Sequence, residues 1–311
     1  GRVTGVQTCA LPICLNEVKI QNVGSDIMGV NSMGVNSMGG AQNPVKVIAV
    51  TSGKGGVGKT NVSVNLAVSL ARTGHSVVLM DADLGLANVD VMLGLHAKHN
   101  ISHVLNGEKS LDDILMVGPA GIKVIPATSG VKRMAELSPV ENAGLIRSFA
   151  ELQTPVDIMI VDVAAGISDS VLSFGRAAHE VVVVVCDEPS SITDAYALIK
   201  VLSRDYGVER FHVLANMVES EAHGRILFKK IAIVSERFLD VTLDYLGTVP
   251  FDTQLRKAIQ RQNAVCEFSP NSPSAQAFRK IASNVEKWPN PAHAGGYLEF
   301  FVERLLQQDT G

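Results

Sequence analysis

The feature that most constrains the fold is a glycine-rich loop between an apolar, β-branched run and a helical pattern. The run covers residues 45–51, and Ser-Gly-Lys-Gly-Gly-Val-Gly-Lys-Thr follows at once as residues 52–60. The spacing Gly-x4-Gly-Lys-Thr is that of a Walker A phosphate loop, in the strand–loop–helix setting that it requires. The glycines let backbone N–H groups turn toward phosphate oxygens, and the helix start adds its positive end. We therefore predict a nucleotide site at the carboxyl end of a buried strand.

The residues of this loop have separable expected roles. Lys59 is expected to reach the β- and γ-phosphates, and Thr60 to offer its hydroxyl to Mg²⁺. The alternative is a glycine-rich turn with a stray lysine, which the strand before it and the helix after it disfavour. The predicted nucleotide-binding residues of the segment are Gly53, Lys54, Gly55, Gly56, Val57, Gly58, Lys59, Thr60 and Asn61.

Further apolar runs indicate the architecture around this loop. They cover residues 76–81, 122–126, 156–163, 181–186, 211–215 and 246–249, and most lack polar alternation, which suits strands buried on both faces. Helix start signals lie between several of them, such as Ser110-Leu-Asp-Asp113 and Ser138-Pro-Val-Glu141. We predict an α/β fold with a doubly wound, mainly parallel sheet flanked by helices, in which ligands bind at the carboxyl ends of the strands.

Carboxylates close two of these runs. Asp81 and Asp83 end the run at 76–81, and their spacing lets both point into one Mg²⁺–phosphate site. Asp162 ends the apolar run 158–161, which is a Walker B pattern whose carboxylate holds Mg²⁺ through water. The residues predicted to hold the Mg²⁺ ion, directly or through water, are Thr60, Asp81 and Asp162. A helix cap or turn is the alternative for Asp81, and an ordinary strand end is the alternative for Asp162.

Composition limits the partners that the chain can have. Of 311 residues, 46% are hydrophobic and the net charge is −4, which supports a large core and no general attraction to nucleic acid. The four cysteines form no C-x-x-C pair, and no apolar stretch approaches the roughly 20 residues that cross a bilayer. We therefore expect a soluble, cytoplasmic protein without direct nucleic-acid binding.

The chain resembles a known family beyond these motifs. Lys54 gives the loop the second lysine of the deviant Walker A group, which includes MinD and ParA. The segments IAVTSGKGGVGKTN (48–61), VVLMDADLGLANVDVMLG (77–94), VCDEPSSITDAYALIK (185–200) and LEFFVERL (298–305) resemble the FleN/FlhG branch, whose members set flagellar number. Asn61 departs from the Thr or Ser usual in the wider group, although it suits this branch.

The resemblance implies an ATP-dependent, dimerising switch ATPase with slow hydrolysis, and it assigns roles to residues. Lys54 would cross to the nucleotide of a facing subunit, so that ATP joins a homodimer. Asp83 would position the attacking water, which makes Lys54, Lys59 and Asp83 the predicted catalytic residues. Asn216 would bind adenine through its side chain, and the loop Pro250, Phe251 and Asp252 through its backbone.

The resemblance also implies partners and a location. The partners are a FleQ-like, σ54-dependent activator, which such proteins restrain, and the GTPase FlhF. Residues 298–306 place apolar side chains on one helical face, and the family uses such a helix for reversible attachment to the inner face of the membrane or to the cell pole. Docking on the protein's own surface is the alternative, because this helix has one Arg and two Glu and so lacks a basic face.

The expected organisation has three parts. Residues 1–43 are expected to be disordered or artefactual, because 28–39 repeat a five-residue unit of Gly, Asn, Ser, Val and Met without helical or strand period, and the opening GRVTGVQTCALPIC resembles sequencing-adapter read-through. Residues 44–290 form the ATPase domain, and residues 291–311 form the amphipathic helix and tail.

Other functions of this loop remain as alternatives. A spatial positioning ATPase acts at a division site or in DNA segregation, and the latter needs a cationic surface. An iron–sulfur carrier needs paired cysteines, whereas Cys186 and Cys266 are solitary in the sequence.

Overall fold

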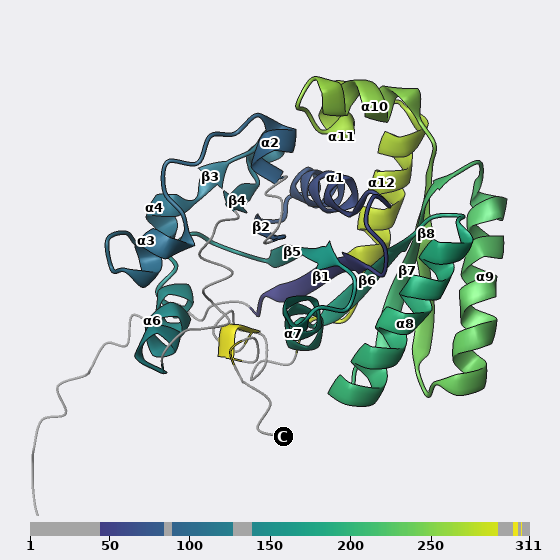
Figure 1. Cartoon of the computed structure of the whole chain (residues 1–311). Helices are drawn as coiled ribbons and strands as arrows, with labels where there is room; N and C mark the ends of the chain where they lie inside the picture. The colour runs from purple at the N-terminus through teal and green to yellow at the C-terminus, as the bar shows by residue number, and fades with distance from the viewer. Residues whose placement is uncertain (1–43, 84–88, 127–138, 292–300, 304–305, 307–311) are drawn as a thin grey trace, which may run out of the picture. The chain divides into compact units, whose positions relative to one another are not determined.

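The computed structural model in Figure 1 describes residues 44–83, 89–126, 139–291, 301–303 and 306. The predicted segment 1–43, the cap residue Ser138 and most of the tail lie outside these residues. Within them, no helix is long and apolar enough to cross a membrane.

The described strands form one eight-stranded sheet in the order β3-β4-β2-β5-β1-β6-β7-β8. The strands are β1 (Lys46–Ser52), β2 (Val77–Ala82), β3 (Met116–Val117), β4 (Lys123–Ile125), β5 (Ile158–Ala165), β6 (Glu180–Val185), β7 (Arg210–Val218) and β8 (Thr242–Pro250). The pairings are parallel except for the one between β3 and β4. The α/β, mainly parallel fold predicted from the sequence is therefore confirmed.

Helices cover both faces of the sheet (Figure 1). One face carries α1 (Lys59–Ala71), α2 (Val89–Leu93), α10 (Thr253–Gln260), α11 (Val265–Phe268) and α12 (Pro273–Val285). The other carries α3 (Ile101–Leu105), α4 (Leu111–Ile114), α6 (Pro139–Ala150), α7 (Asp169–Ala177), α8 (Pro189–Tyr206) and α9 (Glu221–Phe238). A 3-10 turn, η1 (Pro119–Gly121), precedes β4.

Two separate cores follow from this layering. Alternate residues of the central strands point to opposite faces, so Val47 and Ala49 join one core while Ile48 and Val50 join the other. All four are fully buried. This is why the strand sequences read as continuous apolar runs without alternation.

The predicted start of α4 is confirmed as a capping box. The Ser110 hydroxyl accepts from the N–H of Asp113 at 3.2 Å, and the Asp113 carboxylate accepts from the N–H of Ser110 at 3.0 Å. These bonds satisfy two backbone donors that the first helical turn leaves without partners.

A polar cluster lies at the edge of the sheet where the parallel strands begin. His212 of β7 is buried and bonds Glu180 of β6 through Nε2 at 2.8 Å. The indole of Trp288, just past α12, stacks on the His212 ring with centroids 3.9 Å apart. Lys46 Nζ donates to the Trp288 carbonyl at 2.9 Å, which ties the end of α12 to β1.

The described part of the tail packs against the protein. Phe301 and Val302 are fully buried in the core on the α7 and α8 face, and the Phe301 ring lies 6.4 Å from that of Phe174 on α7. This arrangement agrees with the docked alternative for the tail.

Candidate functional site

The phosphate loop leaves the end of β1 and enters α1 in a conformation that requires glycine. Gly56 and Gly58 have φ of 81° and 88°, the left-handed region that side chains disfavour. A β-carbon on Gly53 would lie 2.1 Å from the backbone carbonyl carbon of Asp194 on α8, so this glycine is fixed by close packing. The loop is therefore held against α8.

Lys59 and Thr60, at the end of the loop that enters α1, lie beside a buried acid. Lys59 is 9% exposed, and Thr60 hydrogen-bonds the carboxylate of Asp162, which lies within β5. Ser63, one turn further along α1, also donates to Asp162 Oδ1, at 2.8 Å. Burial raises the pKa of Asp162 to about 7, although the bonds from Thr60 and Ser63 oppose that rise. A bound divalent cation would favour the ionised form of this acid.

Asp81 lies beside Asp162 in the sheet. The two residues are register partners on β2 and β5, and both are 1% exposed. Asp81 accepts from the backbone N–H groups of Asp83 and Val89, each at 3.1 Å. It therefore holds the backbone at Asp83 and at the first residue of α2. Its predicted role near the metal stays a prediction, as does the role of Asp83.

Asn216 at the end of β7 faces the phosphate loop. Its Nδ2 donates to the Val57 carbonyl at 2.8 Å, and a β-carbon on Gly58 would lie 2.5 Å from Nδ2. Its Oδ1 is buried and has no hydrogen-bond partner among the described residues. A buried acceptor without a partner is costly, and the amino group of adenine would supply the donor.

The loop after β8 forms the neighbouring part of the predicted base site. Val218 pairs with Pro250, and Phe251 donates its N–H to the Val218 carbonyl at 2.9 Å, with its side chain 59% exposed. Asp252 caps α10 by accepting from Gln254 N, and it accepts from Ser274 Oγ at 2.6 Å. Those bonds give Asp252 a capping role, and its contact with a base stays a prediction.

Lys54 lies at the exposed side of the loop. Its Nζ forms an ion pair with Glu188 and donates to Ser190 Oγ at 2.8 Å. The Glu188 bond is the main cause of a raised pKa at Lys54. The lysine that would cross to a facing subunit is thus bound within its own chain, at the start of α8.

Sequence reasoning missed two of these partners. Ser63 follows Lys59 by four residues, so both lie on one side of α1, a spacing that could have indicated it. Glu188 belongs to the segment 185–200 that carries the family resemblance, but no local pattern pairs it with Lys54 across 134 positions. The structure brings Lys59, Thr60 and Asp162 together, with Asp81 beside them, and places Asn216 against the loop. The donors and carboxylates present fit a nucleotide with Mg²⁺.

Known proteins are similar to this chain in sequence. The ParA family model, described as NUBPL iron-transfer P-loop NTPase, matches residues 43–286. Antiactivator FleN of Pseudomonas aeruginosa is 57% identical over 86% of this chain and 96% of its own length. Flagellum site-determining protein YlxH of Helicobacter pylori is 35% identical over 84% of this chain and 90% of its own.

Solved structures share the fold. MinD in the MinC:MinD cell division complex of Aquifex aeolicus superposes with a TM-score of 0.64 at 26% identity, over 80% of this chain and 98% of its own. MinD of Pyrococcus horikoshii, solved with Mg-ADP, gives 0.59 at 25% identity, over 78% and 96%. With the phosphate loop, its second lysine and the neighbouring acids on β2 and β5, these findings show that the chain belongs to the MinD/ParA family of P-loop ATPases, in the branch of FleN and FlhG.

Proposed function

We propose that the chain is an ATP-dependent, dimerising switch ATPase that regulates flagellar number by restraining a FleQ-like activator and acting with FlhF. The observation that carries the switch is the placement of the two loop lysines. Lys59 is buried beside Asp162, whereas Lys54 is held at the surface by Glu188 and Ser190. The identity to antiactivator FleN supports the flagellar output.

The residues divide the work of the switch. Lys59 and the loop N–H groups bind the phosphates, Thr60 and Asp162 hold Mg²⁺, and Asn216 selects adenine. Mg²⁺ supplies charge neutralisation on the phosphates when bound. Asp83 orients water for slow hydrolysis, which acts as the timer. Lys54 exchanges Glu188 for the nucleotide of the facing subunit, an exchange helped by the low net stability of exposed ion pairs.

Light scattering with an Asp83→Ala variant tests the switch. ATP, and not ADP, should double its mass, because the trapped ATP state is the dimer. A monomer with both nucleotides would contradict the proposal. The regulation of flagellar number is tested by counting flagella in cells that lack the gene and in the same cells complemented with the wild type or with Lys59→Ala. An unchanged count would leave a switch ATPase with another target.

Membrane contact through the tail is the remaining part of this proposal. Phe301 and Val302 lie in the core, so attachment requires them to leave it. Flotation with anionic vesicles should then show binding with ATP and little with ADP. Equal binding in both states would contradict nucleotide control.

A spatial positioning ATPase, at the division site or in DNA segregation, is the second candidate, favoured by the fit to the MinD fold. Division defects with normal flagella, or salt-sensitive DNA binding with ATP, would indicate it. An iron-transfer role would need accessible cysteine ligands. Cys186 and Cys266 are 6% and 2% exposed.

A further inference from the structure

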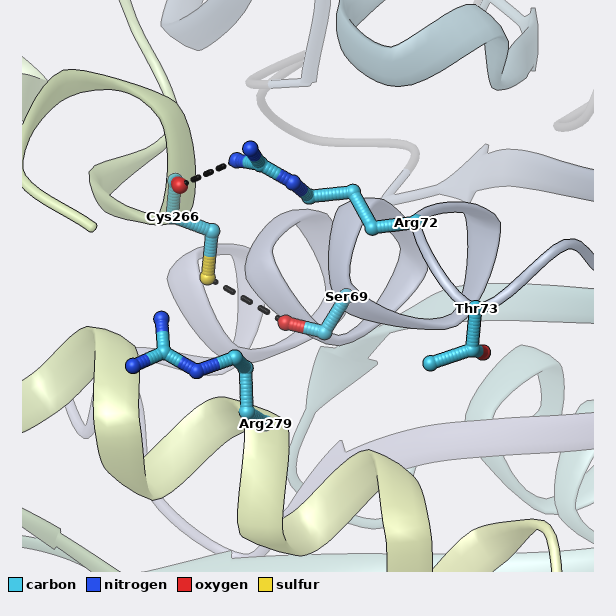
Figure 2. Close-up of a pocket in the computed structure, with 5 residues that line it drawn as sticks. All are labelled: Ser69, Arg72, Thr73, Cys266 and Arg279. Carbon is cyan, nitrogen blue, oxygen red and sulfur yellow. Dashed lines mark hydrogen bonds between the residues drawn. The ribbon is translucent and has the colours of Figure 1, made fainter.

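A cavity of about 250 Å³ lies at the far end of α1, away from the phosphate loop (Figure 2). It is bounded by α1, α11 and α12. Its lining residues are Ser69, Arg72, Thr73, Cys266 and Arg279. With a rise of 1.5 Å per residue along α1, the lining residues Ser69 and Arg72 lie about 15 to 20 Å from Lys59. The cavity is therefore separate from the nucleotide site.

Two guanidinium groups converge on this cavity. Figure 2 shows Arg72 and Arg279 reaching toward Cys266 from α1 and α12. Arg72 Nη1 donates to the Cys266 carbonyl at 2.5 Å, and Arg279 Nη1 donates to the Pro270 carbonyl. A guanidinium has five N–H donors in a fixed fork, so each arginine keeps donors beyond its one backbone bond.

Neither arginine forms an ion pair with a carboxylate among the described residues. Glu286, past the end of α12, is instead paired with His75 at 3.3 Å. Two like charges at one cavity repel each other, and this repulsion is relieved by an anion that bridges them.

The floor of the cavity is polar and neutral. Ser69 Oγ lies 3.2 Å from Cys266 Sγ, and both residues are 2% exposed. Burial raises the pKa of the Cys266 thiol, so no thiolate competes with an incoming anion. The serine hydroxyl adds a further donor to the two guanidinium groups.

We propose that this cavity binds a dianionic phosphate group, either free or carried by a small metabolite. A phosphate dianion balances both arginines, whereas a single carboxylate balances one. Its oxygens accept bidentate bonds from guanidinium forks. The volume is slightly below that of pockets for drug-sized ligands, which suits a small phosphate ester.

Calorimetric titration of the full chain carrying Lys59→Ala tests the proposal, because this background weakens phosphate binding at the nucleotide site. The titrants are inorganic phosphate and glycerol phosphate. Arg72→Gln and Arg279→Gln should each weaken binding by at least about tenfold, the loss expected for charge-assisted bonds. Lys280→Gln, the neighbour of Arg279 on α12, removes the same charge away from the cavity and should leave the affinity unchanged.

The free and esterified ligands are separated by their relative affinities. Tighter glycerol phosphate assigns a metabolite, and binding of inorganic phosphate alone assigns the free anion. Arg72→Lys keeps the positive charge but loses the two parallel N–H donors of the guanidinium, so its loss of phosphate affinity should be smaller than that of Arg72→Gln. An unchanged circular dichroism spectrum would show that the variant is folded. Absence of binding by both titrants, or unchanged affinity in both glutamine variants, would overturn the proposal.

Discussion

The two lysines of the phosphate loop lie in contrasting surroundings, although they are only five positions apart in the sequence. Lys59 is 9% exposed at the start of α1, beside a buried acid. Lys54 has a side chain that is 36% exposed and forms its ion pair with a glutamate that is 56% exposed. A buried charge is costly to move, whereas an exposed ion pair exchanges partners readily. We therefore expect Lys59 to hold a ligand in place and Lys54 to exchange its ion-pair partner.

Loss of Lys59 should have the largest effect on nucleotide binding. Lys59→Ala removes a charge-assisted phosphate contact, so we expect ATP affinity to fall about 100-fold or more. Fluorescent nucleotide titration measures this, with Lys280→Ala as a control for lost charge. If Lys59→Ala kept its ATP affinity, Lys59 would matter no more for nucleotide binding than the exposed Lys54, and the contrast between them would fail.

Loss of Lys54 should separate binding from assembly. Lys54→Ala is expected to keep ATP affinity within about twofold, because this side chain is exposed and faces Glu188. It should lose the ATP-dependent dimer, as measured by light scattering in the Asp83→Ala background. A dimer that persists would show that Lys54 contributes no contact across the interface.

Substitution of Asp162 should have a smaller effect, on stability, and the size of that effect should depend on pH. Its pKa is raised to about 7, so the folded chain binds more protons than the unfolded chain between about pH 4 and pH 7. The free energy of unfolding contributed by this group therefore falls as pH rises through that window. Asp162→Asn removes the charge but keeps an acceptor for Ser63, so the nucleotide-free variant should melt a few °C higher than wild type at pH 8 and show a smaller difference at pH 5. Equal shifts at both pH values would contradict the assignment.

Asn216 should contribute at the level of one or two hydrogen bonds. Asn216→Ala is expected to weaken ATP binding about 2–10-fold and to reduce preference for ATP over GTP. Competition titration with both nucleotides measures the ratio. An unchanged ratio would remove Asn216 from base selection.

The smallest effect is expected at Glu188. Glu188→Gln weakens the bond that holds Lys54 in its own chain, so half-maximal dimerisation should need a few-fold less ATP. A concentration series in light scattering measures this, with Glu209→Gln as a control at another exposed acid. A higher ATP requirement would show that Glu188 serves the dimer and not the monomer.

Much of the fold could be predicted because its signals are local. The glycine loop, the apolar strands and the capping box at Ser110 each depend on neighbours in sequence. The edge strand β3 was missed because two residues of an antiparallel pair carry no period. The bonds from Asn216 to Val57 and from Lys54 to Glu188 join residues more than 130 positions apart, so only the folded chain shows them.

The stacking of Trp288 on His212 gives the chain an intrinsic optical reporter. The sequence has one tryptophan, so ultraviolet emission excited at the indole arises from a single place. That place is the edge where the parallel strands begin, and the carbonyl of this residue is tied to β1 by Lys46. A red shift of tryptophan emission on heating or in denaturant would therefore report when the end of α12 separates from the sheet. Such spectra would follow unfolding of this edge without a label.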